Sequence, residues 1–143
     1  MKAKQEAKRI TSGHTNGRRT IWDIVTKGDA GGGKPLFHLS YFTPVHAGAQ
    51  IGGAREGFGH YHALMWETYI ILAGSCVMSL RDIDGVDAVH ERIEVRMGDA
   101  PIKVEVRPRM VHRLIALEPT ILLIAATAEQ TPDDTFEAEL PIP

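Results

Sequence analysis

The chain has 143 residues, 43% of them hydrophobic, which fits one domain that buries roughly two thirds of its unfolded surface. Its 16 basic and 18 acidic side chains leave a formal net charge of -2, without the basic surplus that a nucleic-acid partner requires. Cys76 is the single cysteine and cannot form an intramolecular disulfide, and no stretch has the features of an export signal. The longest apolar run is too short to cross a bilayer. We therefore expect a soluble cytoplasmic protein without a membrane partner.

The order of residue types predicts an all-β fold with two flanking segments. Residues 1–18 are expected to form an N-terminal tail, in which Met1–Ile10 is compatible with a short exposed helix. Residues 19–128 are expected to form a β-barrel domain, because short runs of β-branched and aromatic residues alternate with Gly, Pro and Asp. Residues 129–143 read as an acidic C-terminal arm that lies over the barrel or reaches a neighbouring subunit.

Eight runs inside the expected barrel are rich enough in branched or aromatic residues to predict strands. They are Thr20–Thr26, Leu36–Thr43, Thr68–Leu72, Cys76–Asp82, His90–Met97, Ile102–Val106, Val111–Leu117 and Thr120–Ala126. Ala73-Gly74-Ser75 is predicted to break the third run from the fourth. Ile93, Val95 and Met97 alternate with charged residues, which is typical of a half-buried strand.

Three histidines and a glutamate have the chemistry of a metal site. In an extended strand alternate side chains share a face, so His60 and His62 point the same way and Tyr61 points away. Glu67 follows five residues later, far enough for the chain to bend into a new strand, and His112 must come from a strand adjacent in space. Imidazoles with a carboxylate suit Fe, Mn, Ni, Zn or Cu rather than Ca or Mg. The alternative is that each histidine is an ordinary hydrogen-bonded residue near a strand end.

Residues 53–74 resemble the first motif of the cupin superfamily, whose members are double-stranded β-helix proteins of the jelly-roll type. That motif has the form His-x-His, three or four residues, Glu, six residues and Gly. His60, His62, Glu67 and Gly74 match it throughout. The resemblance implies a barrel in which these side chains hold a divalent transition metal, and we expect a homodimer with one ion per subunit.

Residues 98–112 resemble the second cupin motif in part. Gly98 and His112 stand at the expected positions, but Arg107 stands where the family usually has Pro and Arg109 where it has Gly. The departure concerns the turn before His112, which Pro108 can still shape. The two motifs together extend the resemblance to about residues 36–127.

The cupin fold hosts many activities, so the reaction needs separate support. Gly17–Trp22 and Phe37–Pro44 resemble the opening of small bacterial cupins associated with sugar-nucleotide and polysaccharide biosynthesis. This implies isomerisation or epimerisation of a sugar or sugar derivative. Glu67 favours a metal-dependent isomerase, similar to the cupin-type phosphoglucose isomerases, because deoxysugar ketoisomerases of this type lack the carboxylate.

Such an isomerase uses its metal as a Lewis acid while a base moves a proton between adjacent carbons. His38 and Tyr69 are the catalytic candidates, since Tyr69 follows Glu67 by two residues and shares its face, although both are also compatible with packed strand residues. Candidates to hold a phosphate or carboxylate near the mouth are Arg55, Arg109 and Arg113.

Three other functions remain open at this point. Phe58, Met65 and Trp66 flank the ligands with apolar surface, which suits a polyketide-type cyclase. Two of the histidines with Glu67 resemble the ligand set of metal-dependent oxygenases. The protein is also compatible with binding a small molecule without turnover. Cys76 lies in an apolar strand and is interpreted as a buried small hydrophobe.

Overall fold

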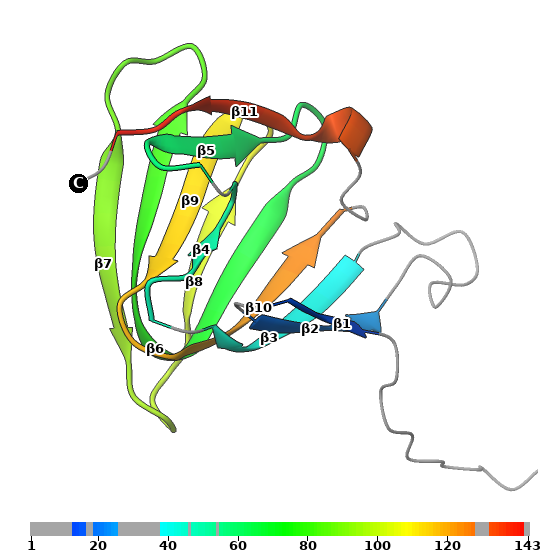
Figure 1. Cartoon of the computed structure of the whole chain (residues 1–143), viewed down its shortest axis with the longest axis vertical. Helices are drawn as coiled ribbons and strands as arrows, with labels where there is room; N and C mark the ends of the chain where they lie inside the picture. The colour runs from blue at the N-terminus through cyan, green and yellow to red at the C-terminus, as the bar shows by residue number, and fades with distance from the viewer. Residues whose placement is uncertain are drawn as a thin grey trace, which may run out of the picture.

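The computed structural model describes residues 13–16, 19–25, 38–45, 47–53, 55–127 and 132–141, and these form an all-β structure (Figure 1). Met1–Ile10 lies outside the described residues. The elements are β1 (Gly13–Asn16), β2 (Arg19–Val25), β3 (His38–Val45), β4 (Gln50–Ile51), β5 (Phe58–Tyr61), β6 (Glu67–Asp82), β7 (Val89–Val95), β8 (Ile102–Val106), β9 (Met110–Ala116), β10 (Thr120–Ala126), the 3-10 turn η1 (Pro132–Asp134) and β11 (Phe136–Glu139).

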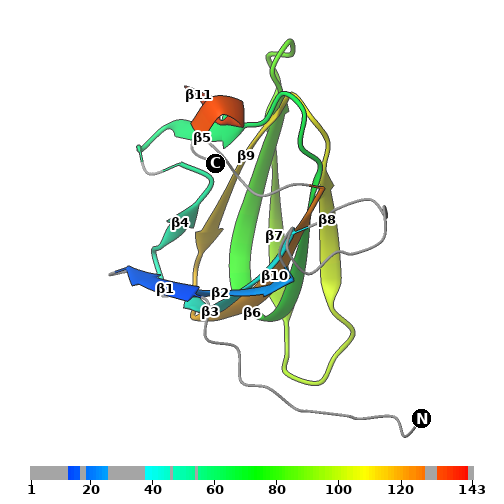
Figure 2. The same cartoon turned by 90° about the vertical axis from the view of Figure 1, so that its right-hand side faces the viewer.

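Strand β6 belongs to both layers of the fold. Its first half, Glu67–Ala73, pairs with β10, and β8 runs along the other edge of that half. Its second half, Gly74–Asp82, pairs with β7 and β9. The strand order β1-β2-β3-β10-β6-β9-β5-β11 therefore passes through β6, and the strands curve around a common interior (Figures 1 and 2).

The predicted break at Ala73-Gly74-Ser75 is wrong, because β6 runs through it without interruption. Gly74 has a φ of +117°, and a Cβ atom at this position would lie 2.6 Å from the carbonyl oxygen of Pro119. A glycine allows both this backbone conformation and this close approach. The glycine thus turns the strand from one sheet into the other instead of ending it.

The six other predicted strands agree with β2, β3, β7, β8, β9 and β10 to within two residues at each end. Four strands lie outside the eight predicted runs, namely β1, β4, β5 and β11, and each has only two to four residues. The extended strand expected around His60 and His62 corresponds to β5, which ends at Tyr61. Strand β1 lies within the range expected to be a tail, and β11 lies within the expected C-terminal arm. Runs this short carry too few side chains for an alternating pattern to be recognised.

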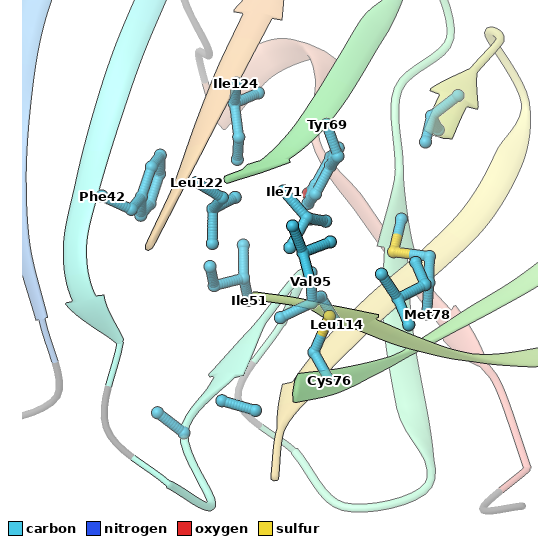
Figure 3. Packing of buried hydrophobic residues seen from close by; sticks show 14 of the residues in the cluster. Phe42, Ile51, Tyr69, Ile71, Cys76, Met78, Val95, Leu114, Leu122 and Ile124 are labelled. Carbon is cyan, nitrogen blue, oxygen red and sulfur yellow. The ribbon is translucent and has the colours of Figure 1, made fainter. Parts of the chain in front are cut away.

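A hydrophobic core fills the interior between the two sheets. Ile71, Leu114 and Leu122 are completely buried, and they come from β6, β9 and β10 (Figure 3). The thiol of Cys76 is buried in the same cluster, as the sequence predicted. Tyr69 also belongs to the cluster and lies two residues from Glu67 on the inward face of β6, so the core borders the predicted metal ligands. In the described part of the chain, no helix is long and apolar enough to cross a membrane.

Candidate metal centre

The four predicted ligands converge on one place inside the barrel. One ligand atom from each of His60, His62, Glu67 and His112 lies within 4.8 Å of the others. His60 lies in β5 opposite His112 in β9, which is the register pair that joins the two strands. Glu67 is the first residue of β6, so the new strand starts where the sequence predicted. The strand pairing thus brings together residues that are 52 positions apart in the chain.

The backbone sets the orientation of two of the imidazole rings. Nδ1 of His62 lies 2.6 Å from the carbonyl oxygen of Asp134, and Nδ1 of His112 lies 2.9 Å from that of Met110. A carbonyl oxygen only accepts hydrogen bonds, so Nδ1 carries the proton in each ring. In its neutral form each ring therefore directs the lone pair of Nε2 into the site, and this is the form that binds metal ions.

Three buried polar atoms face one another at the centre of the site. Oε2 of Glu67 lies 2.9 Å from Nε2 of His112 and 3.5 Å from Nε2 of His62. These distances suit an ion pair with a protonated ring, yet none of the three atoms has a partner in hydrogen-bond geometry within the described residues. The three residues are at most 6% exposed, so water cannot readily provide the missing hydrogen bonds. A cation between the lone pairs would satisfy all three atoms, and the donor set fits a divalent transition metal.

The electrostatics of the site also favour a cation. Burial alone would raise the pKa of Glu67, but the adjacent imidazoles of His112 and His62 outweigh it and lower that pKa well below its usual range. Burial alone would lower the pKa of His62, but Glu67 and the Asp134 carbonyl outweigh it and raise that pKa. The carboxylate therefore stays charged in a buried position, where a positive ion is attracted strongly.

His60 forms the more accessible side of the site. Its ring lies 4.8 Å from that of His62 and 4.6 Å from that of His112, centroid to centroid, and the residue is only partly buried. Of the apolar residues expected around the mouth, Met65 is buried and Trp66 is 53% exposed. His60 is thus the only one of the four ligands that is not fully buried.

The structure describes the side chain of one predicted catalytic residue, Tyr69, and only the backbone of the other, His38. Tyr69 is buried, and its ring meets that of His112 edge to face at a centroid distance of 5.8 Å. The backbone of His38 pairs with Ala126 in β10, and Ala126 pairs on its other side with Glu67, so all three lie in one row across the sheet. The side chain of His38 lies outside the described residues. A catalytic role of either residue stays a prediction.

The arginines expected near the mouth are engaged by the protein itself. Arg113 is completely buried, and its guanidinium donates hydrogen bonds to the carbonyl oxygens of Leu140 and Pro141, so its predicted place at the mouth is wrong. An arm over the barrel is one of the two predicted placements of the C-terminal residues, but their contact with Arg113 in β9 was not predicted. The side chain of Arg109 binds Asp84, and Arg55 pairs with Glu137.

The turn before His112 forms despite the departure from the cupin motif. Arg109 adopts a φ of +67°, the left-handed conformation for which glycine is the usual residue. Its backbone N–H donates to the carbonyl oxygen of His62 at 2.7 Å. The turn of the second motif is thus fixed directly to a ligand of the first.

Sequence reasoning missed Asp134, which contacts the site from the C-terminal segment. Its carbonyl oxygen accepts from His62, and its carboxylate accepts from the backbone N–H groups of Ala63, Leu64 and Met65. These contacts span about 70 positions of the chain. No local pattern in the sequence around residue 134 indicates them.

Comparison with known proteins gives a likeness in structure alone. No protein-family model matches the sequence, and no curated protein matches it. A variant of the oxalate decarboxylase from Bacillus subtilis matches with a TM-score of 0.66 and 16% identity over 90% of this chain and 30% of that chain. The capsular polysaccharide assembling protein CapF from Staphylococcus aureus matches with a TM-score of 0.63 and 11% identity over 92% of this chain and 32% of that chain.

CapF in complex with the inhibitor 3-isopropenyl-tropolone matches with a TM-score of 0.64 and 13% identity over 87% of this chain and 33% of that chain. The chain thus spans about a third of the length of the structures it resembles. At these identities the likeness concerns the fold, and it confirms the predicted all-β architecture. The chain therefore has the double-stranded β-helix fold that the sequence predicts.

Proposed function

We propose that the protein binds one divalent transition-metal ion through His60, His62, Glu67 and His112. The observation that carries this proposal is the set of three buried atoms, one carboxylate oxygen and two imidazole nitrogens, that face one another without hydrogen-bond partners among the described residues. An uncompensated group of this kind is costly in a folded protein, and a bound cation removes the cost.

We further propose that the metal-bound protein acts on a small molecule, by isomerisation or epimerisation of a sugar or sugar derivative. Two features support this substrate class. His60 is only partly buried, which supports an approach of a small polar substrate from its side of the site. The structures of similar fold also include a protein described as assembling capsular polysaccharide. The homodimer and the cytoplasmic location stay predictions.

The bound ion would supply Lewis acidity toward a carbonyl oxygen of the substrate. The chain must then provide the group that takes a proton from the carbon beside that carbonyl and returns it to the neighbouring carbon. Tyr69 is the candidate among the described residues, because it adjoins His112 on the face of β6 that carries Glu67. The hydrophobic core beneath it excludes water, which limits loss of the proton to solvent.

Elemental analysis of the purified protein tests the metal site. We expect the wild-type protein to carry or take up about one transition-metal ion per chain, and we expect His62→Ala and Glu67→Ala to lose it. His90→Ala is the matched control, since His90 hydrogen bonds to Ser79 away from the site. A wild-type protein that takes up no stoichiometric metal contradicts the proposal.

Solvent deuterium exchange tests the reaction. The metal-loaded protein is incubated in D₂O with a panel of aldoses, ketoses and nucleotide sugars, and incorporation is followed by NMR. We expect Tyr69→Phe to retain the metal but to lower the rate of incorporation by roughly 100-fold or more, the range of a lost acid–base group. Absence of incorporation across the panel argues against an isomerase.

A metal-dependent oxygenase is the second candidate. His62, Glu67 and His112 are the three enclosed ligands, and two histidines with one carboxylate form the facial ligand set of iron oxygenases. Oxygen uptake by the iron-loaded protein with candidate substrates separates the two functions, because an isomerase needs no oxygen.

A further inference from the structure

The connection between two of the ligands needs support from elsewhere in the chain. Residues 63–66 join His62 to Glu67 and lie outside the strands, so their backbone N–H groups have no ladder partners. The carboxylate of Asp134 accepts from three of these groups. Its oxygens lie 2.8 Å from the nitrogen of Ala63, 3.2 Å from that of Leu64 and 3.1 Å from that of Met65. The fourth N–H group, that of Trp66, donates to Oγ1 of Thr127 at 3.1 Å. Hydrogen bonds to a charged acceptor are the strong ones, so the Asp134 carboxylate is the main side-chain support of the connection.

The backbone of the same residue holds a ligand ring. The carbonyl oxygen of Asp134 lies 2.6 Å from Nδ1 of His62 and so keeps the proton on that nitrogen. Partners of this kind fix the orientation and the basicity of a metal-binding histidine. Asp134 thus controls both the ring of one ligand and the path of the chain to the next.

Strand β11 places Asp134 at this position. It pairs with β5, the strand that carries His60, through the register pairs from Phe136 opposite Tyr61 to Glu139 opposite Phe58. Figure 1 shows β11 running alongside β5, with η1 at its start. The rings of Phe136 and Tyr61 stack at a centroid distance of 5.3 Å.

Two arginines fasten the far end of the same segment. Arg81 donates to the carbonyl oxygen of Glu139 from Nε at 3.1 Å and from Nη2 at 2.8 Å. The buried guanidinium of Arg113 donates to the carbonyl oxygens of Leu140 at 2.9 Å and Pro141 at 3.1 Å. Residues 132–141, which we call the C-terminal clamp, are therefore attached to the barrel at both ends.

We propose that Asp134 is a positioning residue of the metal centre and that docking of the C-terminal clamp sets the metal affinity of the protein. The inference rests on the proposed metal binding. With the clamp docked, His62 presents Nε2 to the ion and the connection holds Glu67 at the right distance. When the Asp134 carboxylate is removed, the connection loses the acceptor of three N–H groups, and both ligands gain freedom that metal binding must then remove.

The test compares Asp134→Asn and Asp134→Ala with the wild-type protein and with Asp133→Ala as the matched control. Asp133 is the exposed neighbour in the same 3-10 turn. Co²⁺ affinity is measured by competition with a chelator, and the visible Co²⁺ absorption bands report ligand geometry. We expect both Asp134 variants to bind Co²⁺ roughly 10- to 100-fold more weakly with altered bands, and Asp133→Ala to bind like the wild type.

A second measurement distinguishes positioning from general loss of stability. Amide hydrogen exchange in chelator should accelerate at residues 63–65 in Asp134→Asn, while the core strands keep their protection. Phe136→Ala covers the case in which the Asp134 variants fail to fold, because it loosens β11 at a residue that is 41% exposed. We expect it to weaken Co²⁺ binding in the same direction by a smaller factor.

The outcomes separate the two proposals. A wild-type protein that takes up no Co²⁺ overturns the proposed function and the inference with it. Wild-type binding with unchanged affinity in the folded Asp134 variants overturns the inference alone. If only Phe136→Ala folds, unchanged Co²⁺ affinity in that variant also overturns the inference alone.

Discussion

A single methyl group at Gly59 should disturb the metal centre although no ligand side chain is changed. Gly59 precedes His60 in β5 and has no positive φ, so alanine is acceptable to the backbone itself. The obstacle to an alanine is the lack of space for its Cβ atom. A Cβ atom at this position would lie 2.6 Å from the carbonyl oxygen of His112 and 2.9 Å from Cδ2 of Leu140.

The size of the effect follows from these distances. Ordinary contact begins at 3.4 Å, so β5 and the backbone at His112 must separate by about 0.8 Å. A metal site tolerates displacements of about 0.5 Å, so we expect Gly59→Ala to lower metal affinity by roughly 10- to 100-fold. Overpacking of this kind also destabilises a fold by about 1–3 kcal/mol. Leu140 can rotate away, but the carbonyl oxygen of His112 belongs to the backbone of β9.

Two measurements on Gly59→Ala check this reasoning. Urea unfolding in chelator gives the free energy of unfolding, and Co²⁺ competition gives the affinity. Gly85→Ala is the matched control, because its new Cβ would make only ordinary contacts with Asp82, at 3.4 Å from its Cβ and 3.5 Å from its carbonyl oxygen, and should change stability by less than about 0.5 kcal/mol. A Gly59→Ala protein with wild-type stability and wild-type affinity would refute the argument that this close approach positions His60 against His112.

Three further predictions concern the thiol, the turn and the pH dependence. Burial raises the pKa of the Cys76 thiol to about 11, so we expect iodoacetamide to label it only after denaturation, as mass spectrometry would show; rapid labelling of the native protein contradicts this. Arg109→Gly should keep the metal affinity and Arg109→Val should lower both affinity and unfolding temperature, since only the β-branched residue resists a φ of +67°; equal behaviour would argue against a left-handed turn. Because the pKa of His62 is raised in the fold, its protonated ring stabilises the metal-free protein fully below pH 6.5, and this stabilisation is lost as pH rises through the raised pKa. Because the pKa of Glu67 is lowered, its carboxylate stabilises the protein above pH 4.5, and this stabilisation is lost as pH falls. Thermal unfolding in chelator should therefore show stability falling above pH 6.5, and stabilisation by added Co²⁺ should rise over the same range, because the ion needs neutral imidazoles.

Three of the four ligands could be predicted because their signals are local, whereas His112 was predicted from the partial match to the second cupin motif. His60 and His62 are separated by one residue, with His60 in β5 and His62 just beyond its end, and Glu67 follows at a spacing that allows a new strand to begin. The content of β-branched and aromatic residues likewise predicted six strands closely, because each run is long enough for that content to stand out. Gly74 was misread for a related reason. A glycine in the sequence marks unusual backbone, but it does not say whether the chain ends a strand there or bends it.

Residue types and spacing therefore determined the all-β class and the chemistry of the ligands. Only the tertiary structure decided how those ligands are oriented. The Nε2 atoms of His62 and His112 point at Glu67 because backbone carbonyls hold the opposite side of each ring, and one of those carbonyls belongs to Asp134, 72 positions away. Likewise Arg113 is an anchor and not an anion site because Leu140 and Pro141 fold over it. Such contacts depend on which strands become neighbours, and that is a property of the whole chain, because strand pairing between distant segments leaves no mark on the local sequence of either one.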